Sequence, residues 1–339
     1  MSIININKNF NTQNKCVKYL ESLRWADGLY CIHCGTDKSI TKRKKSMLYH
    51  CNNCNKDFSV CSGTIFDNTR LPLPKWFLMI DLILNAKKGI SSSQLCSNLD
   101  ITYKTSWLNA MKIRCGMVED IELNGVVESD EMYVGGKPRK TYKNDSSNTQ
   151  MSMVSDDGEL LQISNAKRGR GTSKAKVAGM VERKGKIVLK LMEAFNTRTM
   201  LSMLKNNVDV LNAVVITDEA RFYNGFDDAV EHIVIKHKES FAKGNVHINT
   251  IEGFWSIIKG GIKGNYRSLS KKYLPFYLAE FAYRFNRRNE TKLMFEDYIK
   301  NALSKMNCMV NAEPVKEPTK IFYKRKKRKK DESGRTKIN

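Results

Sequence analysis

Four cysteines, arranged as two C-x-x-C pairs, constrain the fold of this chain more than any other feature. The pairs are Cys31-Ile-His-Cys34 and Cys51-Asn-Asn-Cys54, and sixteen residues separate them. Each pair can present two thiolates from one tight turn, and Zn²⁺ binds four soft ligands of this kind as a tetrahedron. Because the spacing is that of a zinc ribbon, we predict that Cys31, Cys34, Cys51 and Cys54 bind one structural Zn²⁺. Two unrelated pairs of buried or redox-active cysteines are the alternative.

The chain is strongly basic. Its 339 residues include 58 Lys+Arg and 35 Asp+Glu, which gives a formal net charge of +23. A surface of this charge favours a polyanion, and nucleic acid is the commonest one. Residues 316–339 contain 11 Lys+Arg and 3 Asp+Glu, so most of the excess lies elsewhere in the chain.

The basic run YKRKKRKK at 323–330 supports two hypotheses. It has the composition of a nuclear localisation signal, which predicts a nuclear protein if the host is a eukaryote. It is equally compatible with a solvated basic arm that adds nonspecific DNA affinity. In a host without a nucleus we expect a cytoplasmic or nucleoid location.

Membrane insertion and secretion are not expected. The most apolar stretch, 76–84, is nine residues long and contains Asp81, whereas a membrane-spanning helix needs about 20 apolar residues. The N-terminal residues MSIININKNF have neither the apolar core nor the small-residue cleavage site of a secretory signal. We therefore expect that the protein is not secreted.

The pattern of hydrophobic residues divides the N-terminal and C-terminal parts into three regions. Residues 1–69 contain the paired cysteines and form the zinc ribbon region. Residues 70–122 predict three helices, with Thr102 capping the third. These helices are compatible with a helix-turn-helix DNA-binding segment and with a plain helical core unit. Residues 301–339 lose periodicity and form a basic tail that we expect to be disordered.

The remaining region, residues 123–300, predicts a mixed α/β domain. A helix is predicted at 196–210, and stronger helical patterns follow it. Runs of β-branched and other apolar residues predict strands at 126–134, 175–181, 187–192 and 213–217.

Acidic residues that lie on these apolar elements are candidate metal ligands. Asp130 is inside the first strand, with Glu128 on the same face. Asp218 follows the most hydrophobic strand, at the end where open α/β sheets place their sites. Phosphodiester chemistry with two Mg²⁺ needs about three carboxylates converging on ions ~3.5–4 Å apart. Solvated surface charges are the alternative for each residue taken singly.

The helical segment 247–263 carries a third acidic candidate. Its apolar residues predict one buried face, made of Ile251, Phe254, Trp255, Ile258 and Ile262. An adjacent stripe contains Glu252, Ser256, Lys259 and Lys263. Glu252 and Lys259 thus lie two turns apart on one face, where the carboxylate could hold a metal ion and the lysine a phosphate.

Several sequence blocks then occur in a recognisable order. They are ESDEMYVGGK (128–137), TDEARFYNG (217–225), HINTIEGFWSIIKGGIKGNYRSLS (247–270) and YLAEFAYRFNRR (277–288). Together they resemble the DDE transposases of the Merlin superfamily and their bacterial insertion-sequence relatives. CIHCG, CNNCNKDFSVCSGTIFDNT (51–69) and LPLPKWFLMIDLILNAKKGISSSQL resemble the zinc ribbon and helical segment of the same family. The resemblance covers roughly residues 15–300.

The resemblance implies an RNase H-like catalytic core, which is a mixed five-stranded sheet flanked by helices. It implies that Asp130, Asp218 and Glu252 are catalytic and bind two Mg²⁺ or Mn²⁺ ions. Thirty-three residues separate Asp218 from Glu252, in keeping with DDE enzymes. Some relatives carry Asn in place of the final acid, and Asn249 lies one turn before Glu252. We assign the third acidic position to Glu252, with Asn249 as a supporting neighbour. Glu131 follows Asp130 directly, but strand alternation is expected to point it to the opposite face.

The implied activity is that of a DNA transposase, which cleaves transposon ends with a divalent metal and transfers them into target DNA. The implied partner is double-stranded DNA, as terminal inverted repeats and as target. Joining two ends favours a homodimer or higher assembly. A domesticated, transposase-derived DNA-binding or regulatory protein is the main alternative. A nuclease or resolvase on the same fold and a zinc-ribbon transcription factor also remain open.

Basic residues near these motifs are candidate DNA contacts. They are Lys259 on the helix, Lys137, Arg139 and Lys140 in the loop after the first strand, and Arg287 and Arg288 in the last block. Such side chains position DNA through its phosphates but read little sequence. We therefore expect the zinc ribbon and the helices at 91–118 to recognise the terminal repeats.

Overall fold

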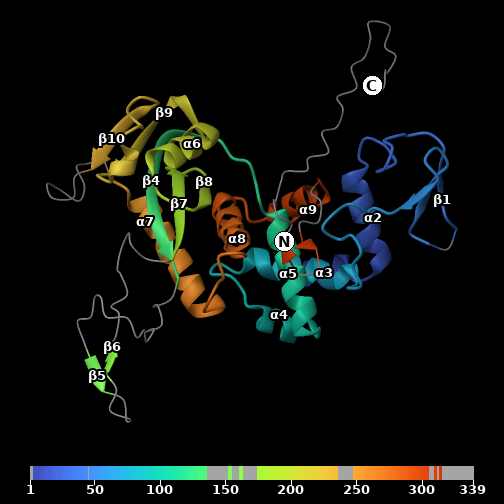
Figure 1. Cartoon of the computed structure of the whole chain (residues 1–339). Helices are drawn as coiled ribbons and strands as arrows, with labels where there is room; N and C mark the ends of the chain where they lie inside the picture. The colour runs from blue at the N-terminus through green and yellow to red at the C-terminus, as the bar shows by residue number, and fades with distance from the viewer. Residues whose placement is uncertain are drawn as a thin grey trace, which may run out of the picture. The chain divides into compact units, whose positions relative to one another are not determined.

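The structure is a computed structural model that describes residues 3–44, 46–135, 152–154, 160–162, 174–235, 247–304, 309–310 and 313–314. The chain divides into two compact units, shown with their elements in Figure 1. The first unit comprises Met1–Asp120 and Pro275–Asn339, and the second comprises Ile121–Leu274. Among the helices of the described segments, none has the length and apolar character needed to cross a membrane. The predicted DNA contacts Lys137, Arg139 and Lys140, and the basic run at 323–330, lie outside the described residues.

A small antiparallel sheet carries the paired cysteines in the first unit. Its strands, in the order β1-β2-β3, are β1 Ile40–Lys42, β2 Tyr49–Cys51 and β3 Lys56–Phe58. Gly35 and Asn55 directly follow the two cysteine pairs and have positive φ angles of 75° and 52°. This left-handed backbone closes each turn, and glycine and asparagine adopt it most readily.

The rest of the first unit is helical. Its helices are α1 Ile3–Asn9, α2 Gln13–Arg24, α3 Leu73–Asn85, α4 Ser92–Leu99, α5 Tyr103–Gly116, α8 Leu274–Asn286 and α9 Met294–Ser304. Two short strands, β11 Met309–Val310 and β12 Glu313–Pro314, pair antiparallel. Ribbon and helices share one buried apolar core that includes Phe58, Trp76, Ile113 and Phe295. The ribbon and these helices therefore belong to one compact unit.

The predicted caps of the middle helices are present. Ser91 Oγ accepts a hydrogen bond from the Gln94 N–H at the start of α4, and Thr102 Oγ1 accepts one from the Thr105 N–H at the start of α5. Asp100, between the two helices, has a left-handed backbone with φ 48°. This short connection is compatible with a helix-turn-helix, which stays a prediction.

Helices α8 and α9 belong to the first unit, whereas the sequence predicted an α/β domain that continues to residue 300. Buried charges explain the difference. Glu280 of α8 pairs with Arg114 of α5 at 2.5 Å and also with Arg284, and both Glu280 and Arg114 are 0% exposed. Because a buried carboxylate is strongly destabilising without its partner, this pairing fixes α8 on α5.

The second unit is built on a five-stranded mixed sheet with strand order β10-β9-β4-β7-β8. β4 pairs antiparallel with β7, which pairs antiparallel with β8, whereas β4, β9 and β10 are parallel to one another. The strands are β4 Leu123–Val134, β7 Ala175–Glu182, β8 Ile187–Met192, β9 Val208–Asp218 and β10 Glu231–Ile235. A separate hairpin pairs β5 Ser152–Val154 with β6 Leu160–Gln162. The predicted fold class, an RNase H-like mixed sheet flanked by helices, is confirmed.

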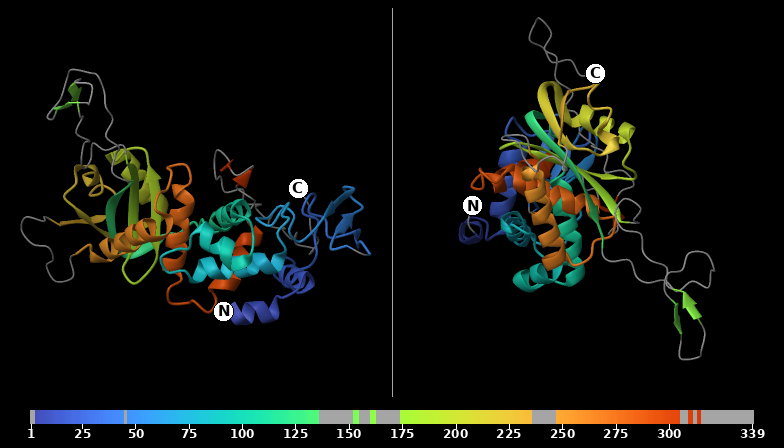
Figure 2. Two further views of the ribbon diagram at one scale, coloured as in Figure 1. Left: turned by 90° about the horizontal axis from the view of Figure 1, so that it is seen from below. Right: turned by 90° about the vertical axis from the view of Figure 1, so that its left-hand side faces the viewer.

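Two helices pack on opposite faces of this sheet (Figures 1 and 2). α6, Thr197–Asn207, contributes Met200, Met203 and Leu204 to a core with Ala178 and Met180 of β7. α7, Asn249–Gly261, lies over Gly179, the residue between those two. Since successive strand residues point to opposite faces, the helices cover the two sides. A short 3-10 turn, η2 Arg221–Tyr223, follows β9, and a π-helical turn, η3 Ile262–Tyr266, continues α7.

Candidate functional site

The structure brings the four cysteines of the two pairs together. Their four sulfur atoms all lie within 4.8 Å of one another. The Cys31 and Cys54 sulfurs are 3.6 Å apart, as are those of Cys34 and Cys51. Four soft ligands converging from two tight turns form the donor set of a structural Zn²⁺ site.

The protonation of these thiols also favours a bound cation. Hydrogen bonds from the Thr36 backbone N–H and the Asn53 amide lower the pKa of Cys34 to about 6. Burial, together with the neighbouring thiols, raises the pKa of Cys54 to about 12. Four thiolates cannot lie this close without a compensating charge, so the set fits a divalent ion that displaces the remaining protons.

A cluster of acidic side chains forms the second candidate site. Carboxylate oxygens of Asp130, Glu131 and Asp218 lie within 4.8 Å of one another. Asp130 and Glu131 come from the middle of β4, and Asp218 is the last residue of β9. The parallel pairing between these strands ends at Glu128 and Ile216, so the acids gather just beyond the last paired residues of the two strands.

The position of Glu131 differs from the prediction that strand alternation would separate it from Asp130. Its carboxylate joins the cluster and accepts a hydrogen bond of 3.5 Å from the Tyr223 hydroxyl. Beyond Glu128, β4 no longer pairs with β9, so its edge is open on that side. The longer glutamate side chain can therefore reach around the open edge to the aspartates. An Asp-Glu pair located where one strand outruns its parallel neighbour is the signal that would have identified it.

The surroundings of Asp130 raise its proton affinity. Trp255 of α7 donates a 2.9 Å hydrogen bond from its indole Nε1 to Asp130 Oδ2, which favours the ionised carboxylate, but burial outweighs this effect. Burial raises the pKa of Asp130 to about 6, and the negative charges of Asp218 and Glu252 add to the increase. Carboxylates that repel one another in a partly buried site are stabilised by a divalent cation, so the cluster fits the predicted Mg²⁺ or Mn²⁺.

We expect the divalent-metal affinity of this cluster to fall about tenfold from about pH 7 to about pH 5. A carboxylate must lose its proton to bind a metal ion. With its pKa at about 6, Asp130 is mostly ionised at the higher pH and mostly protonated at the lower. Calorimetric titration of Mn²⁺ into the zinc-loaded protein at both pH values measures the change. Equal affinities in the wild type would contradict this expectation, and Asp130→Asn should weaken the dependence.

Helix α7 places the other predicted residues. Its buried residues include Ile251, Phe254, Trp255 and Ile258, which were predicted from the sequence. Glu252 and Lys259 are both exposed, as the stripe of the helix predicts. The Glu252 carboxylate lies outside the group of three acids but close enough to raise the pKa of Asp130.

The predicted DNA contacts Arg287 and Arg288 are engaged within the first unit. Arg287 donates to both carboxylate oxygens of Glu119, at 2.7 and 2.5 Å, and its guanidinium lies 3.7 Å from the centre of the Tyr283 ring. Arg288 lies 4.1 Å from the centre of the Phe285 ring. The Arg287 guanidinium is thus committed to the fold, which makes it a poor candidate for a phosphate contact.

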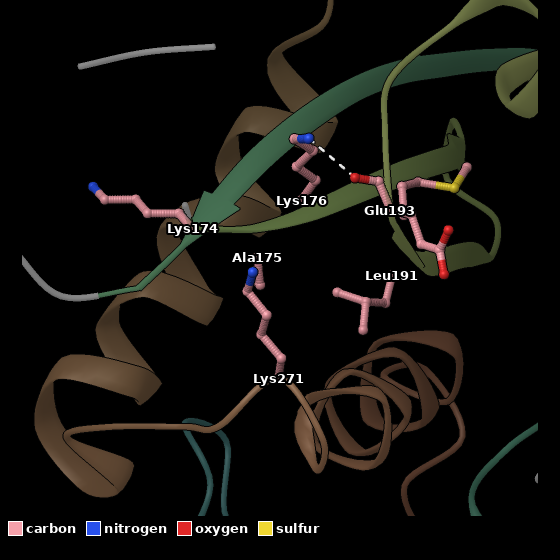
Figure 3. Close-up of a pocket in the computed structure, with 7 residues that line it drawn as sticks. Lys174, Ala175, Lys176, Leu191, Glu193 and Lys271 are labelled. Carbon is pink, nitrogen blue, oxygen red and sulfur yellow. Dashed lines mark hydrogen bonds between the residues drawn. The ribbon is translucent and has the colours of Figure 1, made fainter. Parts of the chain in front are cut away.

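A pocket of about 550 Å³ in the second unit collects lysines that the sequence did not single out. Lys174 and Lys176 come from the start of β7, and Lys271 comes from the segment before α8 (Figure 3). Lys176 Nζ donates to the Glu193 carbonyl at 3.0 Å. The remaining lining residues are Ala175, Leu191 and Met192. No sequence pattern relates Lys174 to Lys271, because only the fold brings them together.

Two family models match separate parts of the chain. Residues 122–286 match an ISXO2-like transposase domain, and residues 11–57 match a transposase zinc-ribbon domain. A related protein is an uncharacterised protein in transposable element ISH50 of Halobacterium salinarum. It is 26% identical over 288 residues, which cover 82% of this chain and 92% of that protein.

Two solved structures also show distant similarity. A pre-cleavage Mos1 transpososome has 12% identity and a TM-score of 0.24, and a Mos1 mariner paired end complex with Mn has 13% identity and a TM-score of 0.25. Each match covers 66% of this chain and 78% of the other chain. The two family models, the four clustered cysteines and the acids on the mixed sheet agree with one another. The chain therefore combines a transposase zinc-ribbon domain with an ISXO2-like transposase domain of the DDE type.

Proposed function

We propose that this protein is an active DNA transposase that cleaves the ends of its element and joins them to target DNA. The observation that carries the proposal is the convergence of Asp130 and Asp218 at the open edge of β4, within a transposase domain. The motif blocks at 128–137, 217–225, 247–270 and 277–288 support its placement in the Merlin superfamily. Because Asp130, Asp218 and Glu252 are all present, a domesticated protein that only binds DNA is disfavoured.

Asp130, Asp218 and Glu252 are the residues we assign to the divalent ions. When bound there, these ions supply Lewis acidity toward the phosphate and the attacking oxygen. The protein holds the carboxylates in place, with Trp255 fixing one oxygen of Asp130 at 2.9 Å. Lys259 lies two turns beyond Glu252 on the same exposed stripe and can bind a neighbouring phosphate.

The proposed reaction has two in-line displacements at phosphorus. In the first, a water oxygen bonds to phosphorus at the element's end, and the bond to the 3′ oxygen breaks to give a free 3′ hydroxyl. In the second, that hydroxyl bonds to a target phosphorus and displaces the target's own 3′ oxygen. Positioning and charge stabilisation suffice for both steps, so no covalent intermediate with a protein side chain is required.

Strand transfer tests this proposal against the nuclease and regulatory alternatives. Full-length protein is incubated with Mg²⁺, a DNA that carries the element's own terminal repeats, and a circular target. The proposal predicts products in which the 3′ end of the element is joined to target DNA. Cleavage without joined products would favour a nuclease, and binding without cleavage would favour a regulatory protein.

Substitutions of the two glutamates decide which of them completes the catalytic set. We expect Glu252→Gln to reduce cleavage by on the order of 10²-fold even at saturating Mg²⁺. Glu131→Gln should weaken Mn²⁺ binding roughly tenfold but cleave well once metal is saturating. Rates measured across a metal titration separate these effects. The reverse pattern would assign the third catalytic position to Glu131.

The lysine-lined pocket supplies a path for the DNA backbone. Replacing Lys174 and Lys271 together by Gln is expected to lower the slope of log K against log salt by about 1–2, because fewer phosphates are neutralised. Fluorescence anisotropy with unrelated duplex DNA at several salt concentrations measures the slope. The matched control removes the exposed Lys186 and Lys205 of the same unit. Equal slopes for both double variants would exclude the pocket as a DNA contact.

Recognition of the ends is assigned to the zinc ribbon and to the N-terminal turn of α5. Tyr103, at the start of α5, is 57% exposed, and Lys104 beside it is also exposed. Both are available to contact DNA, as the first turn of a recognition helix would be. Because two ends must be brought together for joining, we also infer a homodimer or higher assembly on DNA.

A further inference from the structure

A buried carboxylate on β4 holds the first turn of helix α7. Glu128 lies two residues before Asp130 and is 0% exposed, yet it is not part of the acid cluster. Its oxygens accept hydrogen bonds from the Thr250 N–H at 2.8 Å, the Ile251 N–H at 3.1 Å and the Thr250 hydroxyl at 2.9 Å. The first N–H groups of a helix have no partner inside it. Glu128 therefore caps α7 from a strand that is more than a hundred residues away in the sequence.

Arg183, in the turn that follows β7, completes this attachment. Its Nε donates a 2.7 Å hydrogen bond to Glu128 Oε1, and its Nη2 donates a 2.6 Å bond to the His247 carbonyl just before α7. The Arg183 backbone N–H also bonds the Val126 carbonyl of β4 at 2.9 Å. The buried charge of Glu128 is thus balanced by a guanidinium that itself grips the chain entering α7.

The middle of α7 is fixed on the same strand pair. Trp255 donates to Asp130, and its indole lies over Gly179, which pairs with Asp130 across the sheet. A Cβ atom at position 179 would lie 2.6 Å from the Trp255 ring, so the glycine leaves room for it. Glu252 directly follows Ile251, whose N–H is held by Glu128. The attachments at Glu128 and Asp130 therefore set the position and rotation of α7, and with them the place of Glu252.

We propose that Glu128 is a positioning residue for the catalytic metal site. It holds α7 so that Glu252 stands beside Asp130, and it binds neither metal nor DNA itself. This inference rests on the proposed role of Glu252 as a metal ligand. Residues that orient metal ligands typically contribute 10–100-fold to metal affinity or activity. A carboxylate suits this position because its two oxygens can accept hydrogen bonds from several N–H groups at once.

The test combines Glu128→Gln with Glu252→Gln and measures Mn²⁺ binding by calorimetry on the zinc-loaded, full-length protein. We expect Glu128→Gln alone to weaken Mn²⁺ binding about tenfold. In the Glu252→Gln background the same change should have less than about a twofold effect, because the ligand that it positions is already absent. Equal, additive losses in both backgrounds would overturn the proposal, since Glu128 would then act on the ions directly or through general stability.

A milder variant guards against misfolding. Thr250→Val removes one donor to Glu128 while leaving β4 and all charges intact, and it should lower Mn²⁺ affinity in the same direction. Thr12→Val is the matched control, because it removes the hydroxyl that caps α2 in the first unit. It should leave Mn²⁺ binding unchanged. If Thr250→Val and Thr12→Val have the same Mn²⁺ affinity as the wild type, the positioning role is excluded.

Hydrogen exchange separates failure of this inference from failure of the proposed function. The amides of Thr250 and Ile251 should exchange at least about tenfold faster in Glu128→Gln, whether or not Glu252 binds metal. Unchanged protection of these amides would overturn the attachment itself. Faster exchange together with unchanged Mn²⁺ binding would overturn the positioning role. A Glu252→Gln protein that binds Mn²⁺ as the wild type does would instead count against the proposed ligand.

Discussion

Replacing Asp130 or Asp218 by asparagine is expected to reduce Mg²⁺-dependent cleavage of the element's ends by on the order of 10³-fold, about 4 kcal/mol of transition-state stabilisation. Both side chains lie in the acid cluster, and asparagine keeps their shape while removing the negative charge that a divalent ion requires. Single-turnover cleavage of end DNA measures the loss. Asp228→Asn, an exposed aspartate in the same unit, is the matched control and should cleave normally.

The stability of the Asp130 variant distinguishes lost chemistry from a lost fold. The pKa of Asp130 is raised from its ordinary value to about 6, so the folded protein disfavours its ionised form. The unfolded chain has no such preference, so Asp130 lowers the stability of the metal-free protein by an amount that grows as the pH rises from 3.8 and is complete above about 6. Asp130→Asn removes this cost. The metal-free variant should melt at the same temperature as the wild type or higher, and a marked decrease would mean that lost folding explains lost cleavage.

Replacing a zinc ligand is expected to cause the largest loss of stability. Cys51 is 0% exposed and belongs to the four-sulfur cluster. The ribbon strands have three residues each, so they cannot bury a core of their own and depend on the metal. Structural zinc sites supply about 10–16 kcal/mol in isolated zinc-finger peptides. Cys51→Ser should therefore lose its zinc, and the first unit should unfold at a much lower temperature.

Zinc content by mass spectrometry and thermal unfolding followed by circular dichroism check this result. The matched control is Cys96→Ser, because Cys96 lies outside the cluster and donates a 2.8 Å hydrogen bond to the Ile101 carbonyl that a serine hydroxyl can replace. Hydrogen exchange should show that the sheet of the second unit stays protected in Cys51→Ser. If Cys51→Ser keeps one zinc per chain and the wild-type melting temperature, the cysteines have no structural role.

Local sequence patterns predicted the features that depend on residues close together in the chain. The spacing of Cys31 and Cys34 reflects a single tight turn, and the buried and exposed faces of α7 follow from helical periodicity. The strands at β4, β7, β8 and β9 were likewise visible as runs of apolar residues. β10 was not predicted, because this edge strand has five residues and only Ile235 among them is buried.

Features that depend on contacts between residues far apart in the sequence could not be predicted from local patterns. In the sequence, Glu128 lies on the same strand face as Asp130 and resembles a second active-site acid. Its contact with the Thr250 N–H at the start of α7, visible only in the structure, shows that it caps a helix. In the sequence, Arg287 resembles a DNA contact. Its hydrogen bond to Glu119, visible only in the structure, shows that it holds the first unit together. Strand alternation predicted that Glu131 would face away from Asp130, but β4 stops pairing with β9 at Glu128, and the Glu131 carboxylate joins the cluster. In each case the partner lies far away in the sequence.

The position of bound Mn²⁺ tests the central claim most directly. Crystals of the wild-type protein grown with Mn²⁺ allow the ion to be located by its anomalous scattering. We predict a peak coordinated by Asp130 and Asp218, with Glu252 or Glu131 as a further ligand, and no such peak in Asp130→Asn crystals. Saturating Mn²⁺ with no peak between Asp130 and Asp218 would contradict a metal-dependent DNA-cleaving centre at this site.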